Sequence, residues 1–246
     1  MSTTTEGVWC LDKPYGWASF DVVARVKKFF PGQKVGHAGT LDPLATGVLI
    51  VCVGRATKQI AAIQEQTKAY TAQVYLGATT ASYDAEQPPL SGCSAGHITT
   101  AHIQAILPSF TGLILQVPPA YSAIKQSGQP VYSAVRKGQE VTLQPRSVQV
   151  YELELTSLIA MPEQGMLAEL RVVCSKGTYI RSLAADMGAR LGVGGFLAGL
   201  TRTAVGNYVL KDAWSLPRLA EHLGMPPPLP PRQLIGPNVQ TLKLLP

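Results

Sequence analysis

The sequence predicts an α+β fold, because strand-like and helix-like patterns both occur along the chain without a regular order. Runs of apolar and β-branched residues alternate with segments of helical periodicity, but they form no repeating strand–helix series and no internal repeat. The chain has 246 residues, of which 46% are hydrophobic, so it is long enough to bury a full core. These observations favour one large domain, or one domain with an appendage.

The first elements are predicted from short periodic segments. Residues 8–11 are apolar and predict a short strand, and residues 48–53 form a continuous apolar run that predicts a buried strand. Between them, apolar positions in residues 19–30 recur with a helical period. This pattern predicts an amphipathic helix capped by Ser19.

The later elements follow from the same two patterns. Helices are predicted at residues 99–107 and 179–191, and the second ends near Gly192, as a C-cap requires. Further strands are predicted at residues 68–76, 147–158, 166–174 and 206–210.

The composition changes from Lys211 onward. Eight of the 19 prolines lie in residues 211–246, and few apolar positions there are periodic. Because proline clusters favour extended segments without internal hydrogen bonds, we expect most of this region to be an arm or tail. Residues 1–210 are then expected to form the main domain, with residues 211–246 as a proline-rich C-terminal tail.

The charge of the chain favours a polyanionic partner. Its net charge is +6, and the positive charge is concentrated in residues 118–146, which contain four cations and one acid. Tyr121 and Tyr132 are interleaved with these cations, a combination that suits phosphates and unstacked bases. A solvated amphipathic helix around residues 132–137 is the alternative interpretation.

Composition also argues against several classes of protein. No apolar run approaches the roughly 18 residues that span a bilayer, and the polar N-terminus does not resemble a secretion signal, so we expect a cytoplasmic protein. The four cysteines are widely spaced, which indicates no disulfide framework. The four histidines miss metal-ligand spacing, so we expect no metal, although a site shared by His97 and His102 stays open. We expect those two histidines on the surface.

Residues 36–49 are the most informative segment, because they place one carboxylate, Asp42, in a glycine-hinged loop before a buried strand. Three glycines allow backbone conformations that other residues avoid, and Pro43 stiffens the chain beside the acid. Two interpretations of Asp42 stay open from these residues alone. It is either a turn residue that accepts backbone hydrogen bonds, or a reactive group presented at the rim of the sheet.

Five segments of the chain, taken in order, resemble one known family. They are residues 11–19, which contain Leu-Asp-Lys-Pro and Gly-Trp-Ala-Ser, and residues 36–49, 68–77, 118–125 and 174–183. Over about residues 8 to 210, the chain resembles the tRNA pseudouridine synthases of the TruB type. These enzymes convert the uridine at position 55 in the T loop of tRNA to pseudouridine.

The resemblance implies a pseudouridine synthase fold, with a mixed, largely antiparallel sheet, flanking helices and a central RNA-binding cleft. Asp42 in the floor of that cleft would be the catalytic carboxylate. The reaction breaks a glycosidic carbon–nitrogen bond, turns the uracil and rejoins it through carbon without a net redox change, so no cofactor is required. Attack of the carboxylate at C1′ of the sugar and attack at C6 of the uracil both stay open.

The resemblance also implies roles for other residues. Tyr70 would stack on the target base and assist removal of the C5 proton. Arg181 would pair with the catalytic carboxylate and keep it ionised. Tyr179 and Leu200 would help to form the uracil pocket, and His37 would fill the space that the flipped nucleotide leaves.

The implied partner is the T arm of tRNA, bound by a monomer, with residues 118–146 closing over the RNA as a basic clamping segment.

The sequence departs from the family in two places. After residue 77 the usual pattern is partly kept, with Thr80, Ser82 and Asp84 present but Ala81 and Gln87 substituted. Residues 211–246 are too few for a complete RNA-binding domain of the PUA type.

Two other functions stay open from the sequence. A non-catalytic tRNA-binding or RNA-folding module would explain the charge and the aromatic residues, but it would not need Asp42, Tyr70 and Arg181 together. A glycosylase that releases the base could use a similar acid, and free uracil among its products would reveal it.

Overall fold

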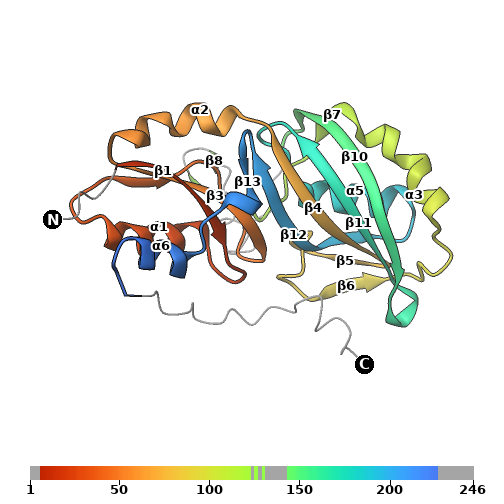
Figure 1. Cartoon of the computed structure of the whole chain (residues 1–246). Helices are drawn as coiled ribbons and strands as arrows, with labels where there is room; N and C mark the ends of the chain where they lie inside the picture. The colour runs from red at the N-terminus through yellow and green to blue at the C-terminus, as the bar shows by residue number, and fades with distance from the viewer. Residues whose placement is uncertain (1–5, 123–124, 127–128, 131–142, 227–246) are drawn as a thin grey trace. The chain divides into compact units, whose positions relative to one another are not determined.

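The computed structural model describes residues 6–122, 125–126, 129–130 and 143–226 (Figure 1). These residues form two compact units. The first unit comprises residues 6–71 and 200–226, and the second unit lies within residues 72–199. Two strands, β4 (Lys68–Leu76) and β12 (Gly195–Val205), contribute residues to both units.

The first unit is built around one strand, β3 (Ala45–Val53), that is buried at every residue except Thr46. Its own elements are β1 (Gly7–Lys13), α1 (Ser19–Phe29), β2 (Val35–His37), β3 (Ala45–Val53), η1 (Gly54–Gln59), α2 (Ile60–Glu65), β13 (Tyr208–Val209), η4 (Leu210–Asp212) and α6 (Leu216–His222). The strands follow the order β1-β3-β12-β4, and β13 pairs with β12. Along its second edge, β3 pairs in parallel with β12 at one end and antiparallel with β2 at the other. Because β3 is covered on both faces, its sequence is a continuous apolar run.

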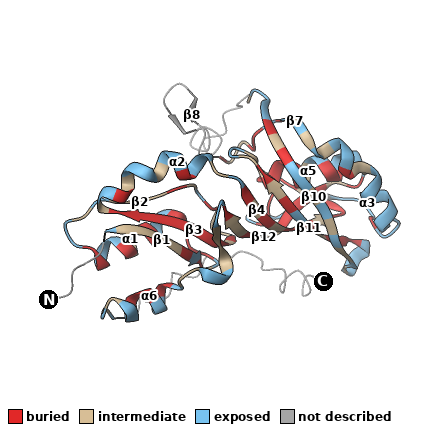
Figure 2. Ribbon diagram, turned by 45° about the horizontal axis from the view of Figure 1, so that its top comes forward, coloured by how far each residue is buried: buried red, intermediate tan, exposed pale blue. Residues whose placement is uncertain are grey.

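The core of the first unit lies between the sheet and two helices. Helices α1 and α6 lie side by side under β1 and β3, with their buried residues turned toward the strands (Figures 1 and 2). Val22, Val26 and Leu219 from these helices pack with Leu11 and Leu49 of the strands, and all five are 0% exposed. The helical period of the sequence therefore matches a real buried face.

The expectation of an extended arm after Lys211 is wrong for its first part, because residues 216–222 form α6. The Ser215 hydroxyl caps this helix by accepting a hydrogen bond from Arg218 N. Pro217 lies in the first turn, where a proline removes no helical hydrogen bond, so the number of prolines misled the prediction. Residues 227–246 of the predicted tail lie outside the described residues.

Replacement of Leu219 by Ala should lower the free energy of unfolding by about 2 to 5 kcal/mol, because it opens a cavity in a core that cannot collapse freely. Chemical denaturation of the purified variant measures this change. Leu113→Ala is the matched control, since Leu113 is 75% exposed, and it should change stability by less than about 0.5 kcal/mol. Equal effects of the two substitutions would show that α6 does not contribute to the core.

The second unit contains a long antiparallel hairpin. Its own elements are β5 (Ala78–Thr80), β6 (Pro89–Gly92), α3 (Thr100–Ile106), η2 (Leu107–Phe110), β7 (Gly112–Gln116), β8 (Lys125–Gln126), β9 (Gln129–Pro130), β10 (Arg146–Ala160), η3 (Pro162–Gln164), β11 (Met166–Cys174) and α5 (Ile180–Arg190). The strand order is β12-β4-β11-β10-β7. The pairing of β10 with β11 runs from Val150 opposite Cys174 to Ala160 opposite Met166, and β7 follows β10 as the edge strand.

The structure confirms the α+β class and the predicted helices and strands, with three main differences. The predicted strand at residues 206–210 is shorter and becomes β13, and the strand β12 before it was not predicted. The short strands β2, β5, β6, β7, β8 and β9 and the short helix α2 were also not predicted. His97 and His102 are exposed, as expected. No helix within the described parts of the chain is long and apolar enough to cross a membrane.

Candidate active site

Asp42 lies in a connection of the first unit that we call the Asp42 loop, residues 38–44, between β2 and β3. The two strands pair antiparallel from His37 opposite Val51 to Val35 opposite Val53. Both ends of the loop are therefore fixed by the sheet. Asp42 is half-buried at this position.

Each backbone carbonyl of residues 39–43 accepts a hydrogen bond, so the loop is held at every residue. Arg202 of β12 binds the first two carbonyls. Its Nη2 donates to Gly39 O at 3.2 Å, and its Nη1 donates to Thr40 O at 3.3 Å. Arg202 is 2% exposed, so the donor side of these hydrogen bonds is shielded from water, which strengthens them electrostatically.

Ser19 holds the centre of the Asp42 loop. Its hydroxyl donates to Leu41 O at 2.9 Å and accepts from Leu41 N at 2.8 Å. The prediction that Ser19 caps α1 is wrong, because Ala18 occupies the N-cap position and Asp21 accepts the hydrogen bond from Ala18 N. The Ser19 side chain therefore positions the loop instead of the helix end.

Lys13 holds the far end of the Asp42 loop. Its side chain is 0% exposed, and Nζ donates to Pro43 O at 3.2 Å, Trp17 O at 2.6 Å and Pro14 O at 3.0 Å. Three acceptors match the three donors of an ammonium group. Burial lowers the pKa of Lys13 from its usual 10.5 to about 8, although the negative charge of Asp42 partly opposes this shift.

The lowered pKa of Lys13 should make the stability of the protein depend on pH. Between about pH 8 and 10.5 the unfolded chain binds a proton that the folded chain has lost, so the free energy of unfolding should rise with pH. The largest slope from one group is about 1.4 kcal/mol per pH unit. Chemical denaturation at several pH values, on the wild type and on Lys13→Met, isolates this contribution as the difference in slope. Identical slopes would contradict a titrating, buried Lys13.

The close contact of β3 with β12 requires glycine at position 47. Gly47 has a φ of +94°, and a Cβ atom there would overlap the backbone carbonyl of Arg202. One residue earlier, the hydroxyls of Thr46 and Thr201 lie 2.9 Å apart and join the same two strands. Gly47 thus lets Arg202 lie close enough to bind the Asp42 loop.

The first unit contains three further residues of the predicted site. Leu200 lies in β12 opposite Ala45, the residue that follows the Asp42 loop. Tyr70 lies in β4 and is 8% exposed. His37 ends β2, and burial lowers its pKa below the usual value, which favours the neutral imidazole; the positive charge of Arg202 acts in the same direction, while the Gly39 backbone opposes it.

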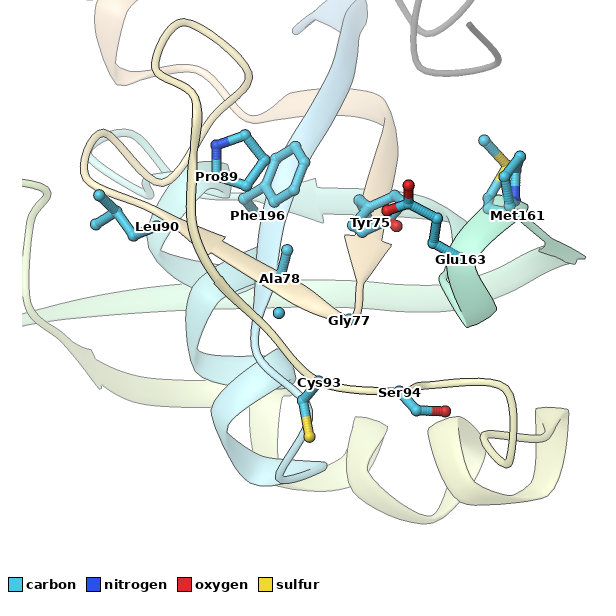
Figure 3. Close-up of a pocket in the computed structure, with 12 residues that line it drawn as sticks. Tyr75, Gly77, Ala78, Pro89, Leu90, Cys93, Ser94, Met161, Glu163 and Phe196 are labelled. Atoms are coloured by element: carbon cyan, nitrogen blue, oxygen red, sulfur yellow. The ribbon is translucent and has the colours of Figure 1, made fainter. Parts of the chain in front are cut away.

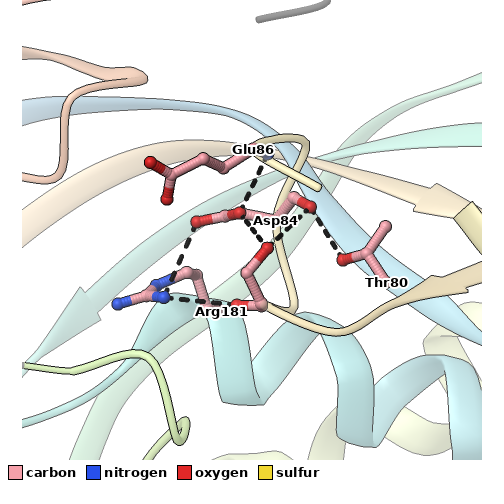
Figure 4. Close-up of polar contacts among 5 residues, drawn as sticks. Thr80, Asp84, Glu86 and Arg181 are labelled. Carbon is pink, nitrogen blue, oxygen red and sulfur yellow. Dashed lines mark hydrogen bonds and ion pairs between the residues drawn. The ribbon is translucent and has the colours of Figure 1, made fainter. Parts of the chain in front are cut away.

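The second unit holds Arg181 in a buried polar network (Figure 4). Arg181 lies in the first turn of α5, and its Nη1 is 3.6 Å from Asp84 Oδ2 and donates to Ser82 O at 3.2 Å. The side chains of Arg181 and Asp84 are only 7% and 6% exposed. A buried pair of this kind needs further hydrogen bonds to offset the loss of hydration.

The loop around Asp84 supplies those hydrogen bonds. Asp84 Oδ1 accepts from the Ser82 hydroxyl at 2.5 Å and from Glu86 N at 3.0 Å, and the Thr80 hydroxyl donates to Asp84 O at 2.7 Å (Figure 4). Thr80, Ser82 and Asp84 are the residues that keep the family pattern after residue 77. These three residues form hydrogen bonds with one another, whereas the substituted Ala81 takes no part in these hydrogen bonds.

Tyr179 is also fixed through its backbone. It is the N-cap residue of α5, and the side chain of Gln116 binds both of its backbone groups. Gln116 Oε1 accepts from Tyr179 N at 2.7 Å, and Gln116 Nε2 donates to Tyr179 O at 3.0 Å. One turn into the helix, the Ser182 hydroxyl donates to Val117 O at 2.7 Å. The end of β7 therefore sets the start of the helix that carries Arg181.

The structure thus groups the predicted site residues by unit. Asp42, His37, Tyr70 and Leu200 belong to the first unit, and Tyr179 and Arg181 belong to the second. The sequence analysis did not identify the residues that hold them in place, which are Arg202, Ser19, Asp84 and Gln116. An arginine in an otherwise uncharged segment and the serine of the Gly-Trp-Ala-Ser motif were the available signals, but neither indicates its partner.

A separate pocket lies in the second unit and contains none of the predicted site residues. It has a volume of about 510 Å³ and is lined by Tyr75, Phe196, Glu163 and Cys93, among others (Figure 3). Phe196 and Tyr75 stack with their ring centroids 5.1 Å apart. Among the described residues, no group of three or more His, Cys, Asp or Glu side chains could hold a metal ion.

Comparison with known families identifies the family of the chain. The model of a family described as "TruB family pseudouridylate synthase (N terminal domain)" matches residues 27–180, which is more than half of the chain. The chain belongs to this family. Pseudouridylate synthases isomerise uridine to pseudouridine, so the predicted family and enzyme class are confirmed.

Three curated relatives carry the name tRNA pseudouridine synthase B. The protein of Thermobifida fusca (strain YX) is 46% identical over 90% of this chain and 77% of its own length. The Mycobacterium leprae (strain TN) protein is 46% identical over 87% of this chain and 68% of its own length. The Bacteroides fragilis (strain YCH46) protein is 47% identical over 85% of this chain and 91% of its own length.

Solved structures confirm the fold. The chain is similar to a protein in a Cbf5-Nop10-Gar1 complex, with a TM-score of 0.65 and 32% identity over 85% of this chain. It is also similar to a protein in the archaeal box H/ACA sRNP Nop10-Cbf5 complex, with a TM-score of 0.64 and 30% identity over 89% of this chain. The chain spans about half the length of these two proteins, with coverages of 52% and 54%.

Proposed function

We propose that this chain converts the uridine at position 55 in the T loop of tRNA to pseudouridine, with Asp42 as the catalytic carboxylate. Its family isomerises uridine to pseudouridine, and curated relatives at 46% to 47% identity are named for action on tRNA. The observation that carries the residue assignment is the Asp42 loop, whose consecutive carbonyls from residue 39 to residue 43 are all hydrogen-bonded. A turn with no chemical task does not require three buried side chains from distant segments to hold it.

The arrangement of the loop suits a reacting carboxylate. Arg202, Ser19 and Lys13 hold the loop through its backbone, which leaves their hydrogen bonds intact whatever happens at the carboxylate of Asp42. The side chain is half-buried, which leaves part of it accessible. A carboxylate held in this way can react with C1′ of the sugar or with C6 of the uracil, and a preorganised position removes part of the entropic barrier.

The other site residues are proposed to bind the extruded nucleotide. A uridine in a folded T loop is stacked and paired, so it must leave the stack before it reaches Asp42. Tyr70 is proposed to stack on the uracil and to assist removal of the C5 proton, and Tyr179 and Leu200 to complete its pocket. The lowered pKa of His37 keeps this ring neutral at pH 7, which suits a residue that fills the vacated space by stacking.

Arg181 is proposed to supply the positive charge of the site. Asp84, Ser82 and the first turn of α5 hold it in one orientation. The ion pair between Arg181 and Asp42 that the resemblance implies stays a prediction. In this proposal Asp84 is the positioning residue for the arginine.

The proposed partner is the T arm, bound by a monomer in the cytoplasm, and the chemistry requires no cofactor because the isomerisation has no net redox change. Positive residues of the 118–146 segment are proposed to contact phosphates. Residues 123–124, 127–128 and 131–142 of that segment lie outside the described residues. Arg146, which begins β10, is exposed and is available for such a contact.

Incubation of the purified protein with an unmodified tRNA transcript tests this function. We expect pseudouridine at position 55 alone, detected by a pseudouridine-specific chemical readout of the T loop. A transcript with cytidine at that position is the control and should gain no pseudouridine elsewhere. Free uracil among the products would indicate a glycosylase, and binding of tRNA without any product would indicate a non-catalytic RNA-binding module.

A further inference from the structure

Arg202 is a buried cation of the first unit, and within the described part of the chain its guanidinium donates hydrogen bonds to backbone oxygens alone. Besides Gly39 O and Thr40 O, it binds Val48 O through Nε at 2.7 Å. Three donors of one planar fork thus reach the loop before Asp42 and the strand after it. Among the described residues, no carboxylate forms an ion pair with Arg202.

The buried charge of Arg202 and the conformation of the Asp42 loop stabilise each other. A buried cation is unfavourable unless hydrogen bonds replace its lost hydration, and the carbonyls of the Asp42 loop supply them. In turn, the carbonyls of Gly39 and Thr40 are directed toward the guanidinium. Three different nitrogens of Arg202 bind the three oxygens, whereas the donors of a lysine all belong to one nitrogen and cannot reproduce this spread.

The three residues that hold the loop act at different places. Lys13 binds Pro43, which follows Asp42, whereas Arg202 binds Gly39 and Thr40, which precede it. Without the arginine, the loop would stay attached at Ala38, at Leu41 through Ser19 and at Pro43, but it would lose the hydrogen bonds at Gly39 and Thr40. The expected consequence is a shifted or mobile carboxylate in a protein that is otherwise folded.

We propose that Arg202 is a positioning residue for the catalytic carboxylate, which it orients through the backbone of Gly39 and Thr40. This inference rests on the proposed role of Asp42. It assigns Arg202 to the chemical step and not to RNA binding, because its guanidinium is covered by the chain and cannot meet a phosphate. A change at Arg202 should therefore lower kcat and leave KM nearly unchanged.

The test compares Arg202→Met and Arg202→Lys with the wild type on the tRNA transcript, well below the unfolding temperature of each variant. We expect kcat of Arg202→Met to fall about 100-fold, the size of loss that a misplacement of about 1 Å can produce, with KM within about threefold. Arg202→Lys keeps the charge but cannot bind all three oxygens, so its kcat should fall about tenfold. Arg55→Met is the matched control, since Arg55 is an exposed arginine of the same unit, and its kcat should not change.

Amide hydrogen exchange at residues 40–42 provides a readout that does not depend on activity. Both Arg202 variants should exchange faster there than the wild type, while exchange in β1 stays unchanged. If the wild type itself forms no pseudouridine, the proposed function fails, and the exchange data still decide whether Arg202 holds the loop.

The inference is overturned if a folded Arg202→Met keeps the kcat of the wild type, or if KM rises while kcat stays constant. It is also overturned if activity falls only in proportion to the unfolded fraction. Should Arg202→Met fail to fold, Arg202→Lys decides by the same criteria. Failure of both variants to fold would make Arg202 a residue of general stability and would end the proposal.

Discussion

We expect the Asp42→Asn variant to form no measurable pseudouridine, which corresponds to a loss in rate of about 10⁴-fold or more. Asparagine has nearly the same shape as aspartate, but it carries no charge and is a poor nucleophile. The loop around it should keep its position, because Arg202, Ser19 and Lys13 form hydrogen bonds to its backbone, which the substitution does not change. Single-turnover assays with excess enzyme on the tRNA transcript measure the rate.

Binding of tRNA provides the control for this prediction. The dissociation constant of Asp42→Asn for the transcript should stay within about tenfold of the wild type, since the phosphate contacts that supply most of the affinity are unchanged. Asp212→Asn, at an exposed aspartate of the first unit, should have the activity of the wild type. Turnover by pure Asp42→Asn would remove Asp42 from the chemistry.

The second large effect concerns the buried pair of Arg181 and Asp84. Arg181→Met should lower the free energy of unfolding by about 3 to 5 kcal/mol, because it leaves the Asp84 carboxylate buried without its cation. Pseudouridine formation should be lost at the same time, because the proposed site loses its positive charge. Chemical denaturation and the transcript assay measure the two effects separately.

A double variant separates stability from activity at this pair. In Arg181→Met with Asp84→Asn no charge stays buried, and the asparagine side-chain oxygen can still accept hydrogen bonds from Ser82 and Glu86. Stability should therefore recover in part, while activity stays lost. Arg171→Met is the matched control: its ion pair with Glu152 is about half-exposed, and the change should be below about 1 kcal/mol. Recovery of activity in the double variant would show that Arg181 has a structural task only.

The sequence predicted the elements whose pattern is strong in itself. The run at residues 48–53 and the helical period at residues 19–30 indicate β3 and α1, because each hides an apolar surface that is visible in the order of residues. β12 was not predicted, although it is central to the first unit. Its residues mix glycine, threonine and a buried arginine, and their burial depends on partners that pattern alone does not identify.

The same limit applies to the site. Asp42 could be singled out because its loop is unusual over several adjacent residues, and the resemblance to a family supplied roles for the others. The contacts that hold these residues could not be predicted in either way, because they join residues that are far apart in the sequence. Ser19 looked like a helix cap and bonds to Leu41, and Asp84 lies 97 positions before Arg181. A hydrogen bond between residues so far apart in sequence leaves no local signal.

The division of the first unit into residues 6–71 and 200–226 has a consequence for biosynthesis. A ribosome makes the chain from its N-terminus, so β1, α1 and β3 exist before β12 and α6, which complete their core. All of residues 72–199 are made in between. The Asp42 loop therefore acquires its arginine only after residues 72–199 have been made, and a nascent chain that stops before Arg202 should lack the hydrogen bonds at Gly39 and Thr40 that we propose position the carboxylate.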